Sequence, residues 1–283
     1  MLAPPGKRIR LRDFDTADTN EFKSHKHAMA KLERNKQRLA KYQDLLYAEH
    51  TYSLLIILQA MDAAGKDSTV KHVMSGVNPE GCEVFSFKRP AGQELDHDFL
   101  WRGYRVLPER GHIGIFNRSY YEEVLVVRVH PTLLRAQHLP PSSPPRREFW
   151  QHRFESVNEM ERHLTRNGTV ILKFFLHLSK EEQRKRFLDR LQDHSKNWKF
   201  SEADVQERLR WDEYQSYYEE LINHTSTPHA PWFIIPADHK WFTHLAVSEV
   251  IVETLKGLHL HYPKVSGAQR RQLRKARKAL QEQ

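Results

Sequence analysis

The segment Ser53–Ala60 constrains the fold more than any other part of the chain. It reads Ser-Leu-Leu-Ile-Ile-Leu-Gln-Ala, a short and almost continuous apolar run. Such a run is typical of a strand buried on both faces, within a parallel sheet that helices cover on each side. Gly65 and Lys66 follow it, and the chain as far as about Gly76 is expected to be helical. The order strand, glycine-containing loop and helix therefore predicts the first unit of a parallel α/β fold.

Four more short apolar segments, at 82–87, 113–116, 169–175 and 232–235, predict four further strands. The expected helices cover residues 21–49, 154–164 and 240–257, and two more begin at Ser179 and Ser201. Because strands alternate with helices and no linker interrupts them, we expect one α/β domain over residues 1–283. Its centre is a parallel five-stranded sheet flanked by helices.

Two helix starts carry a capping signal. Ser179 with Glu182, and Ser201 with Asp204, have the spacing of a capping box. By contrast, residues 130–147 contain five prolines and two serines, which predicts a loop.

The chain is basic, with 45 Lys and Arg against 36 Asp and Glu and a formal net charge of +9. A nucleic acid, an anionic membrane and a phosphate-rich ligand are the three ordinary partners of such a protein. Residues 264–283 hold seven of these basic side chains and one acid, Glu282. This basic C-terminal tail is either a helix or a disordered arm, and a merely solvated terminus is the alternative.

Other function classes are excluded by composition. No apolar run approaches the roughly 18 residues of a transmembrane helix, and residues 1–8 lack the apolar stretch of a signal peptide. The single cysteine, Cys82, excludes an internal disulfide and a cysteine-cluster zinc site, and we expect it to pack in a strand. We therefore expect a cytoplasmic protein that does not act at a membrane.

The loop after the first strand resembles a phosphate-binding loop. Gly65 and Lys66 match the pattern G-x-x-x-x-G-K-[ST], whereas Ala60 replaces its first glycine and Asp67 its last residue. Unpaired amides at a helix N-terminus attract anions. The residues expected to bind phosphate through this loop are Ala63, Ala64, Gly65, Lys66, Asp67 and Ser68.

Asp62 and Asp67 would repel a phosphate in that loop. A Mg²⁺ ion between Asp62 and the phosphate oxygens removes the conflict, because this cation prefers oxygen ligands. The alternative is a helix N-terminus that happens to contain Gly-Lys, with Asp67 satisfying first-turn amides.

The end of the third strand supplies a second polar group. Asn117 and Glu122 offer oxygens for a metal ion, and Arg118 can bind a phosphate through two hydrogen bonds. Alternatively, Asn117 and Ser119 cap a helix and Glu122 is a solvated first-turn acid.

A basic helix supplies the third group. Arg186 and Arg190 are four residues apart and so lie on one face, where a mobile arm could bring them over a transferring phosphate. The alternative is a surface helix with salt bridges to Glu182 or Asp189.

These three groups, in this order, resemble the polyphosphate kinase 2 family over roughly residues 20–262. The resemblance rests on Met61-Asp62-Ala63-Ala64-Gly65-Lys66-Asp67, Phe87-Lys88-Arg89-Pro90, Phe116-Asn117-Arg118-Ser119-Tyr120-Tyr121-Glu122, Arg186-Phe187-Leu188-Asp189-Arg190 and Trp198-Lys199-Phe200-Ser201. Many members have Gly in place of Ser68 and Asp in place of Asn117. The Asn-Arg-Ser-Tyr-Tyr-Glu version resembles the subgroup that accepts AMP as well as ADP, with Glu122 taking over part of the aspartate's work.

The resemblance implies a P-loop kinase-like core with a helical lid at about residues 180–205. It implies reversible transfer of the terminal phosphate of polyphosphate to ADP or AMP, with Mg²⁺, or Mn²⁺ in its place, and a homo-oligomeric assembly. ATP is then the product from ADP, or the donor in reverse.

The resemblance also assigns roles to the site residues. Asp62 and Glu122 would hold the metal ion with help from Asn117, and Lys66 would hold phosphate. Arg118, Arg186 and Arg190 would stabilise charge on the transferring group. Lys88 and Arg89 would bind the nucleotide's phosphates or the polyphosphate.

Two rival functions remain open. An ATP-dependent nucleoside or nucleotide kinase shares the core, metal and lid and differs only in the donor. A nucleic-acid-binding protein would use the basic tail, but the sequence shows no helix-turn-helix or RNP-type motif, and we expect no nucleic-acid partner.

The pairs His25/His27 and His259/His261 lack a carboxylate or cysteine companion nearby in sequence, so we interpret them as ordinary surface or core residues and not as metal ligands.

Overall fold

The computed structural model describes residues 1–283 except 21, 23–24, 141–146, 196 and 283. Within the described residues, five parallel strands form one sheet in the order β2-β3-β1-β4-β5. The strands are β1 (Ser53–Ala60), β2 (Cys82–Ser86), β3 (Ile113–Asn117), β4 (Thr169–His177) and β5 (Trp232–Pro236). The predicted α/β class and its five strands are thereby confirmed.

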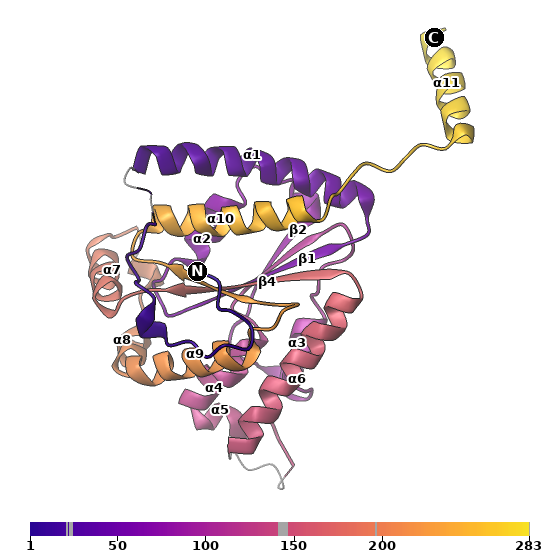
Figure 1. The fold of residues 1–283 in the computed structure, drawn as a ribbon. Coiled ribbons are helices and arrows are strands. Elements are labelled where there is room, and N and C mark those ends of the chain that lie inside the picture. The colour runs from indigo at the N-terminus through magenta and orange to yellow at the C-terminus, as the bar shows by residue number, and fades with distance from the viewer. Residues whose placement is uncertain (21, 23–24, 141–146, 196, 283) are drawn as a thin grey trace.

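Helices cover both faces of this sheet (Figure 1). One face packs against α1 (His25–Glu49), α2 (Lys66–Val73) and α10 (Lys240–Gly257), and the other against α6 (Arg147–Arg166) and α9 (Trp211–Thr225). Every residue of β1 is buried, and its side chains alternate between the two layers. Leu54 and Ile56 belong to the core under α1 and α10, whereas Leu55 and Ile57 belong to the core over α6 and α9. This two-sided burial explains why β1 reads as an apolar run rather than as an alternating one.

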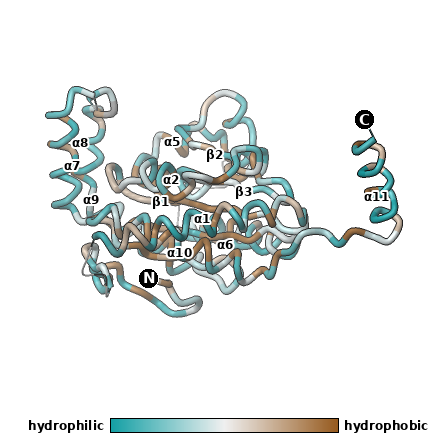
Figure 2. The backbone as a smooth tube through the Cα atoms, turned by 90° about the horizontal axis from the view of Figure 1, so that it is seen from above, coloured by the Kyte–Doolittle hydropathy of each residue, from teal (hydrophilic) through white to brown (hydrophobic). Residues whose placement is uncertain are grey.

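The remaining helices lie at the periphery. The shorter ones are α3 (Trp101–Tyr104), α4 (Val126–Val129) and α5 (Pro131–Arg135). At one end of the molecule stand α7 (Lys180–Gln192) and α8 (Glu202–Leu209), and at the opposite end α11 (Gly267–Gln281) is separated from the sheet (Figure 2). In the part of the chain that the structure describes, no helix is long and apolar enough to span a bilayer.

Three local predictions need correction. Residues 131–135 of the expected loop form α5, because Pro131 suits the first helical position, while 141–146 lie outside the described residues. The single helix expected from Ser201 is two helices that meet at Arg210. The capping box of Ser201 with Asp204 is confirmed. At Ser179 the hydroxyl accepts from the Glu182 amide, but the Glu182 carboxylate accepts from Arg186 instead of completing the box.

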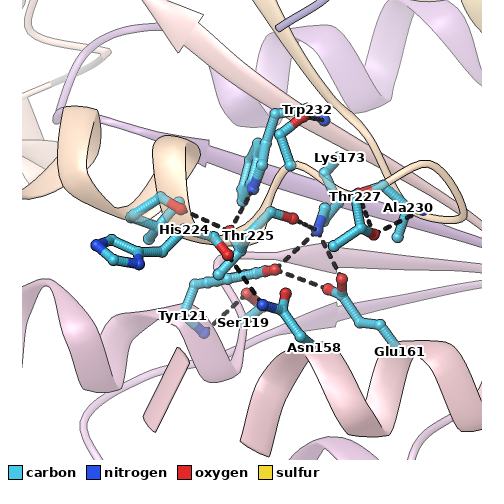
Figure 3. Close-up of polar contacts among 12 residues, drawn as sticks. Ser119, Tyr121, Asn158, Glu161, Lys173, His224, Thr225, Thr227, Ala230 and Trp232 are labelled. Atoms are coloured by element: carbon cyan, nitrogen blue, oxygen red, sulfur yellow. Dashed lines mark hydrogen bonds and ion pairs between the residues drawn. The ribbon is translucent and has the colours of Figure 1, made fainter. Parts of the chain in front are cut away.

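A buried ion pair joins the sheet to α6 (Figure 3). Lys173 of β4 and Glu161 of α6 both have fully buried side chains, and Nζ lies 2.6 Å from Oε2. The ammonium also donates to the Tyr121 hydroxyl (2.9 Å) and to the Thr225 carbonyl (2.7 Å), so all three of its protons are used. Burial lowers the pKa of Lys173, and the charge of Glu161 opposes that shift.

The same pair fixes two aromatic residues beside the candidate site. The hydroxyls of Tyr120 and Tyr121 donate to Glu161 Oε1 at 2.9 Å and 2.8 Å. These tyrosines lie directly between Ser119 and Glu122 in the sequence. The buried pair therefore holds in place the backbone segment that carries Arg118 and Glu122.

Removing one charge from this pair leaves the other buried and unpaired. We expect Lys173→Met to lower the free energy of unfolding by about 3–5 kcal/mol. The double variant Lys173→Met/Glu161→Gln removes both charges and keeps an acceptor for the two tyrosine hydroxyls, so it should recover most of that loss. Urea unfolding at pH 7 measures both, and a double variant no more stable than the single one would contradict the explanation.

Candidate active site

The loop between β1 and α2 turns sharply at the carboxyl edge of the sheet. Its backbone has positive φ at Ala63 (62°) and at Gly65 (105°), and the latter conformation suits glycine. Three side chains donate hydrogen bonds to the carbonyl groups of this loop. Lys66 Nζ donates to the carbonyls of Ala60 (2.9 Å) and Met61 (3.4 Å), Gln183 Nε2 to that of Asp62 (2.9 Å), and Arg186 Nη1 to those of Ala63 and Ala64 (3.0 Å each).

With its carbonyls turned inward, the loop presents its amides. Among the described residues, no protein acceptor pairs with the amides of Ala63, Gly65, Lys66, Asp67 and Ser68. The amide of Ala64, also expected to bind phosphate, instead donates to the Met61 carbonyl at 3.3 Å. Free amides at the start of α2, together with the positive end of the helix dipole, are chemically suited to bind an anion.

Arg186 holds this loop from α7. Besides the two loop carbonyls, its guanidinium donates to Glu182 Oε1 (2.9 Å) and to the carbonyls of Ala237 (2.7 Å) and Asp238 (3.0 Å). All five N–H groups are thus paired, and the side chain is 5% exposed. The sequence predicted an arginine directed at a transferring phosphate, whereas the structure gives Arg186 protein partners that tie α7, the loop and the β5–α10 connection together.

Arg190, one turn later, has a different environment. Its side chain is 25% exposed, and Nη1 lies 4.0 Å from Asp204 Oδ2 on α8. It lines the same cleft as Lys66 and is less constrained than Arg186. Its predicted role on the transferring phosphate stays a prediction.

The end of β3 meets the loop because β1 and β3 are parallel neighbours whose carboxyl ends lie at one edge. Arg118, with φ of 63°, donates from Nη2 to Asp62 Oδ1 at 3.1 Å. Asn117 donates from Nδ2 to Asp67 Oδ1 at 2.7 Å. The structure therefore brings together residues from two predicted motifs, and the aspartates that seemed to repel phosphate are paired with β3.

Glu122 lies in a 3₁₀ helix, η4 (Tyr120–Val124), at the side of this group. Burial raises its pKa, and the positive charges of Arg118 and Lys66 oppose that shift. Burial and the charge of the nearby Arg118 lower the pKa of Lys66. The negative charges of Asp62, Glu122 and Asp67 oppose that shift. These mutual effects indicate that acids and bases from two chain segments, residues 62–67 and 118–122, share one electrostatic environment.

The carboxylates of Asp62 and Glu122 are suitable ligands for a small divalent cation. Asp62 and Glu122 line one cavity of about 190 Å³, together with Arg118, Asp204 and Glu207. Over the described residues, no group of three or more His, Cys, Asp or Glu is arranged to hold a metal ion. Mg²⁺ commonly takes only one or two protein carboxylates, with phosphate oxygens and water completing its shell. Two carboxylates beside a phosphate site satisfy that requirement.

The main cleft, of about 880 Å³, carries an excess of positive charge. Its acids are Asp62, Asp67, Asp189 and Asp204, and its cations are Lys66, Lys71, Lys88, Arg118, Arg186, Arg190 and Lys240. Lys71 and Lys240 were not predicted from the sequence, although Lys71 follows Lys66 on the same helix. Gln183 was also missed, and its position three residues before Arg186 was the available signal.

A second cavity of about 320 Å³ adjoins this cleft. Lys88, Arg118 and Glu122 line it, as does Arg89, which lies outside the main cleft. Its other walls include Leu95, Phe99 and Leu133. The site thus has a charged compartment and a partly apolar one that share Lys88 and Arg118.

Comparison with known proteins agrees with this geometry. The family model of polyphosphate kinase 2 (PPK2) matches residues 22–262. A relative from Rhodopseudomonas palustris, named ADP-polyphosphate phosphotransferase, is 50% identical over 97% of this chain and 95% of its own length. One from Meiothermus ruber, named AMP/ADP-polyphosphate phosphotransferase, is 47% identical over 92% of this chain and 93% of its own. The crystal structure of polyphosphate kinase 2 from Arthrobacter aurescens TC1 superimposes with a TM-score of 0.85 and 36% identity, covering 96% of this chain and 97% of that one.

Arg186 and Arg190, both on α7, should differ in their effect on stability. Arg186→Ala leaves four carbonyls without their donor, so we expect a loss of at least about 2 kcal/mol and a fall in Tm of roughly 5 °C. Arg190→Ala, the matched control, should change the free energy of unfolding by less than about 0.5 kcal/mol. Thermal unfolding followed by circular dichroism measures both, and equal Tm values would show that Arg186 does not hold the loop.

Proposed function

The chain belongs to the polyphosphate kinase 2 family, and on that basis we propose that it transfers the terminal phosphate of inorganic polyphosphate to ADP, to AMP or to both. The observation that carries this proposal is the match, over nearly whole lengths, to two relatives named for this reaction. The cleft supports it physically, because its seven cations against four acids suit a polyanionic donor.

Phosphate would be held at the loop by its free amides and by Lys66. Two of the three ammonium protons already bind the carbonyls of Ala60 and Met61, which places the third toward the cleft that Lys66 lines. Because phosphoryl transfer depends on positioning and charge neutralisation, a pre-formed amide cradle lowers the barrier without a covalent step.

Asp62 and Glu122 would hold a divalent cation, which we propose to be Mg²⁺, with Mn²⁺ as a substitute. When bound, this ion would neutralise charge on the phosphate oxygens. Asn117 assists indirectly, because its hydrogen bond to Asp67 fixes the end of β3 against the loop.

The partly apolar cavity is suited to the acceptor nucleotide. Lys88, Arg89 and Arg118 would bind its phosphates, while Leu95, Phe99 and Leu133 offer a surface for the base. Arg118 lines both cavities and so stands between donor and acceptor. Arg190 would add charge from the lid helices, and Arg186 acts as a positioning residue through the loop. The homo-oligomeric state, the cytoplasmic location and the lid movement remain predictions.

The acceptor range is measured by supplying polyphosphate and Mg²⁺ with AMP or ADP separately, in the absence of ATP. We expect ADP from AMP and ATP from ADP. ATP from ADP alone would keep the reaction and contradict acceptance of AMP. If a folded sample forms product only when ATP replaces polyphosphate as donor, the chain is instead an ATP-dependent nucleotide kinase.

A substitution at Lys66 tests whether the loop after β1 binds phosphate. We expect Lys66→Ala to lower kcat by about 10²–10³-fold, because one preorganised charge next to the transferring phosphate is lost. Lys41→Ala on the exposed side of α1 is the matched control and should retain full activity. Steady-state kinetics give both values, with circular dichroism to check folding. Turnover of Lys66→Ala close to that of the control would exclude the phosphate-loop assignment.

A further inference from the structure

The C-terminal helix α11 has no role in the site described above. It lies apart from the rest of the molecule in both views (Figures 1 and 2). The chain leading to it is anchored as far as Tyr262, whose hydroxyl donates to Asp44 of α1, and His261 donates its amide to Glu49. From His261 to Glu282 every residue is exposed. Yet the helix start is well defined, because Ser266 and Gln269 form a complete capping box.

The charge of α11 is one-sided. Six cations and no acid lie within its 15 residues: Arg270, Arg271, Arg274, Lys275, Arg277 and Lys278. At about 3.6 residues per turn, all six fall within one half of the helix surface. Leu273, Ala276 and Leu280 share the opposite side. The six cations span residues 270–278, so the helix presents to solvent a continuous cationic face roughly 12 Å long.

We propose that α11 is an auxiliary binding arm for inorganic polyphosphate, which holds a part of the donor chain distant from the catalytic cleft. This inference rests on the proposed function, because polyphosphate is the polyanion that this chain is proposed to use. A row of cations binds a polyanion mainly by releasing its counterions, and six cations supply a large, salt-dependent affinity.

The opposite side of the helix argues against two other occupants. Two leucines and an alanine form a narrow apolar stripe, which offers little apolar area for insertion into a membrane interface. The same stripe is too small to bury the surface that a stable contact with a second copy needs. The cations, and not the apolar side, are therefore the recognition surface.

The position of α11 determines how long a polyphosphate chain must be to contact both the helix and the cleft. It lies at the end of the molecule opposite α7 and α8 (Figure 2). Residues of α7 and α8 line the cleft. A short phosphate chain can occupy the cleft alone, whereas a long one can contact the cleft and the arm together. Holding the chain at two points raises the effective concentration of its end near the cleft. The arm should therefore affect only long donors.

The test replaces all six cations in the full-length chain: Arg270→Gln, Arg271→Gln, Arg274→Gln, Lys275→Gln, Arg277→Gln and Lys278→Gln. Glutamine keeps helix propensity while it removes charge. The control variant Leu273→Gln/Leu280→Gln removes the apolar stripe and keeps every cation. For long-chain polyphosphate we expect KM of the six-fold variant to rise at least about tenfold, with a weaker salt dependence. Its kcat, its KM for ADP and its KM for tripolyphosphate should match those of the wild type and of the control.

An unchanged KM for the long chain, or an equal change for long chain and tripolyphosphate, would overturn the proposal. Direct binding of fluorescently labelled long-chain polyphosphate separates this inference from the proposed function. Binding that is at least about tenfold weaker in the six-fold variant supports the arm even if the wild type transfers no phosphate. If instead the variant keeps polyphosphate binding but loses binding to RNA or to phosphatidylserine vesicles, the arm serves a different partner and the proposal fails.

Discussion

The site depends on one constraint, which is that every carbonyl of the loop after β1 must be paired on its inner side. Lys66, Gln183 and Arg186 together pair the carbonyls of residues 60–64. A peptide group has its carbonyl and its amide on opposite sides, so fixing the carbonyls inward directs amides toward the cleft. The free amides of the loop are thus oriented by side chains that bind its carbonyls, and of these Lys66 and Arg186 also line the cleft.

This arrangement couples the loop to the helices that flank the cleft. Gln183 and Arg186 both belong to α7, and Gln183 also accepts a hydrogen bond from Arg208 of α8. A displacement of α7 would therefore release loop carbonyls and change the direction of the amides. Helices α7 and α8 and the loop after β1 are therefore parts of one hydrogen-bonded unit.

A second support lies beneath the end of β3. The buried pair of Lys173 and Glu161 fixes Tyr120 and Tyr121, and the backbone around them carries Arg118 and Glu122. The two supports share no residue. The charged residues differ from region to region. Acids and bases are paired near the loop, the cleft has an excess of cations, and α11 is an exposed cationic helix separated from the sheet. The cleft and α11 together hold a large part of the excess of cations behind the net charge of +9.

The sequence by itself determined the class of fold, the five strands and the complete capping box at Ser201, because the elements concerned are each encoded within a short segment. An apolar run predicts a buried strand, and capping residues predict the start of a helix. Only the tertiary structure decided what the charged side chains bind. Arg186 and Ala64 are 122 positions apart, Arg118 and Asp62 are 56 apart, and Asn117 and Asp67 are 50 apart. No local periodicity encodes such pairs, since they exist only once the parallel strands bring their carboxyl ends to one edge of the sheet.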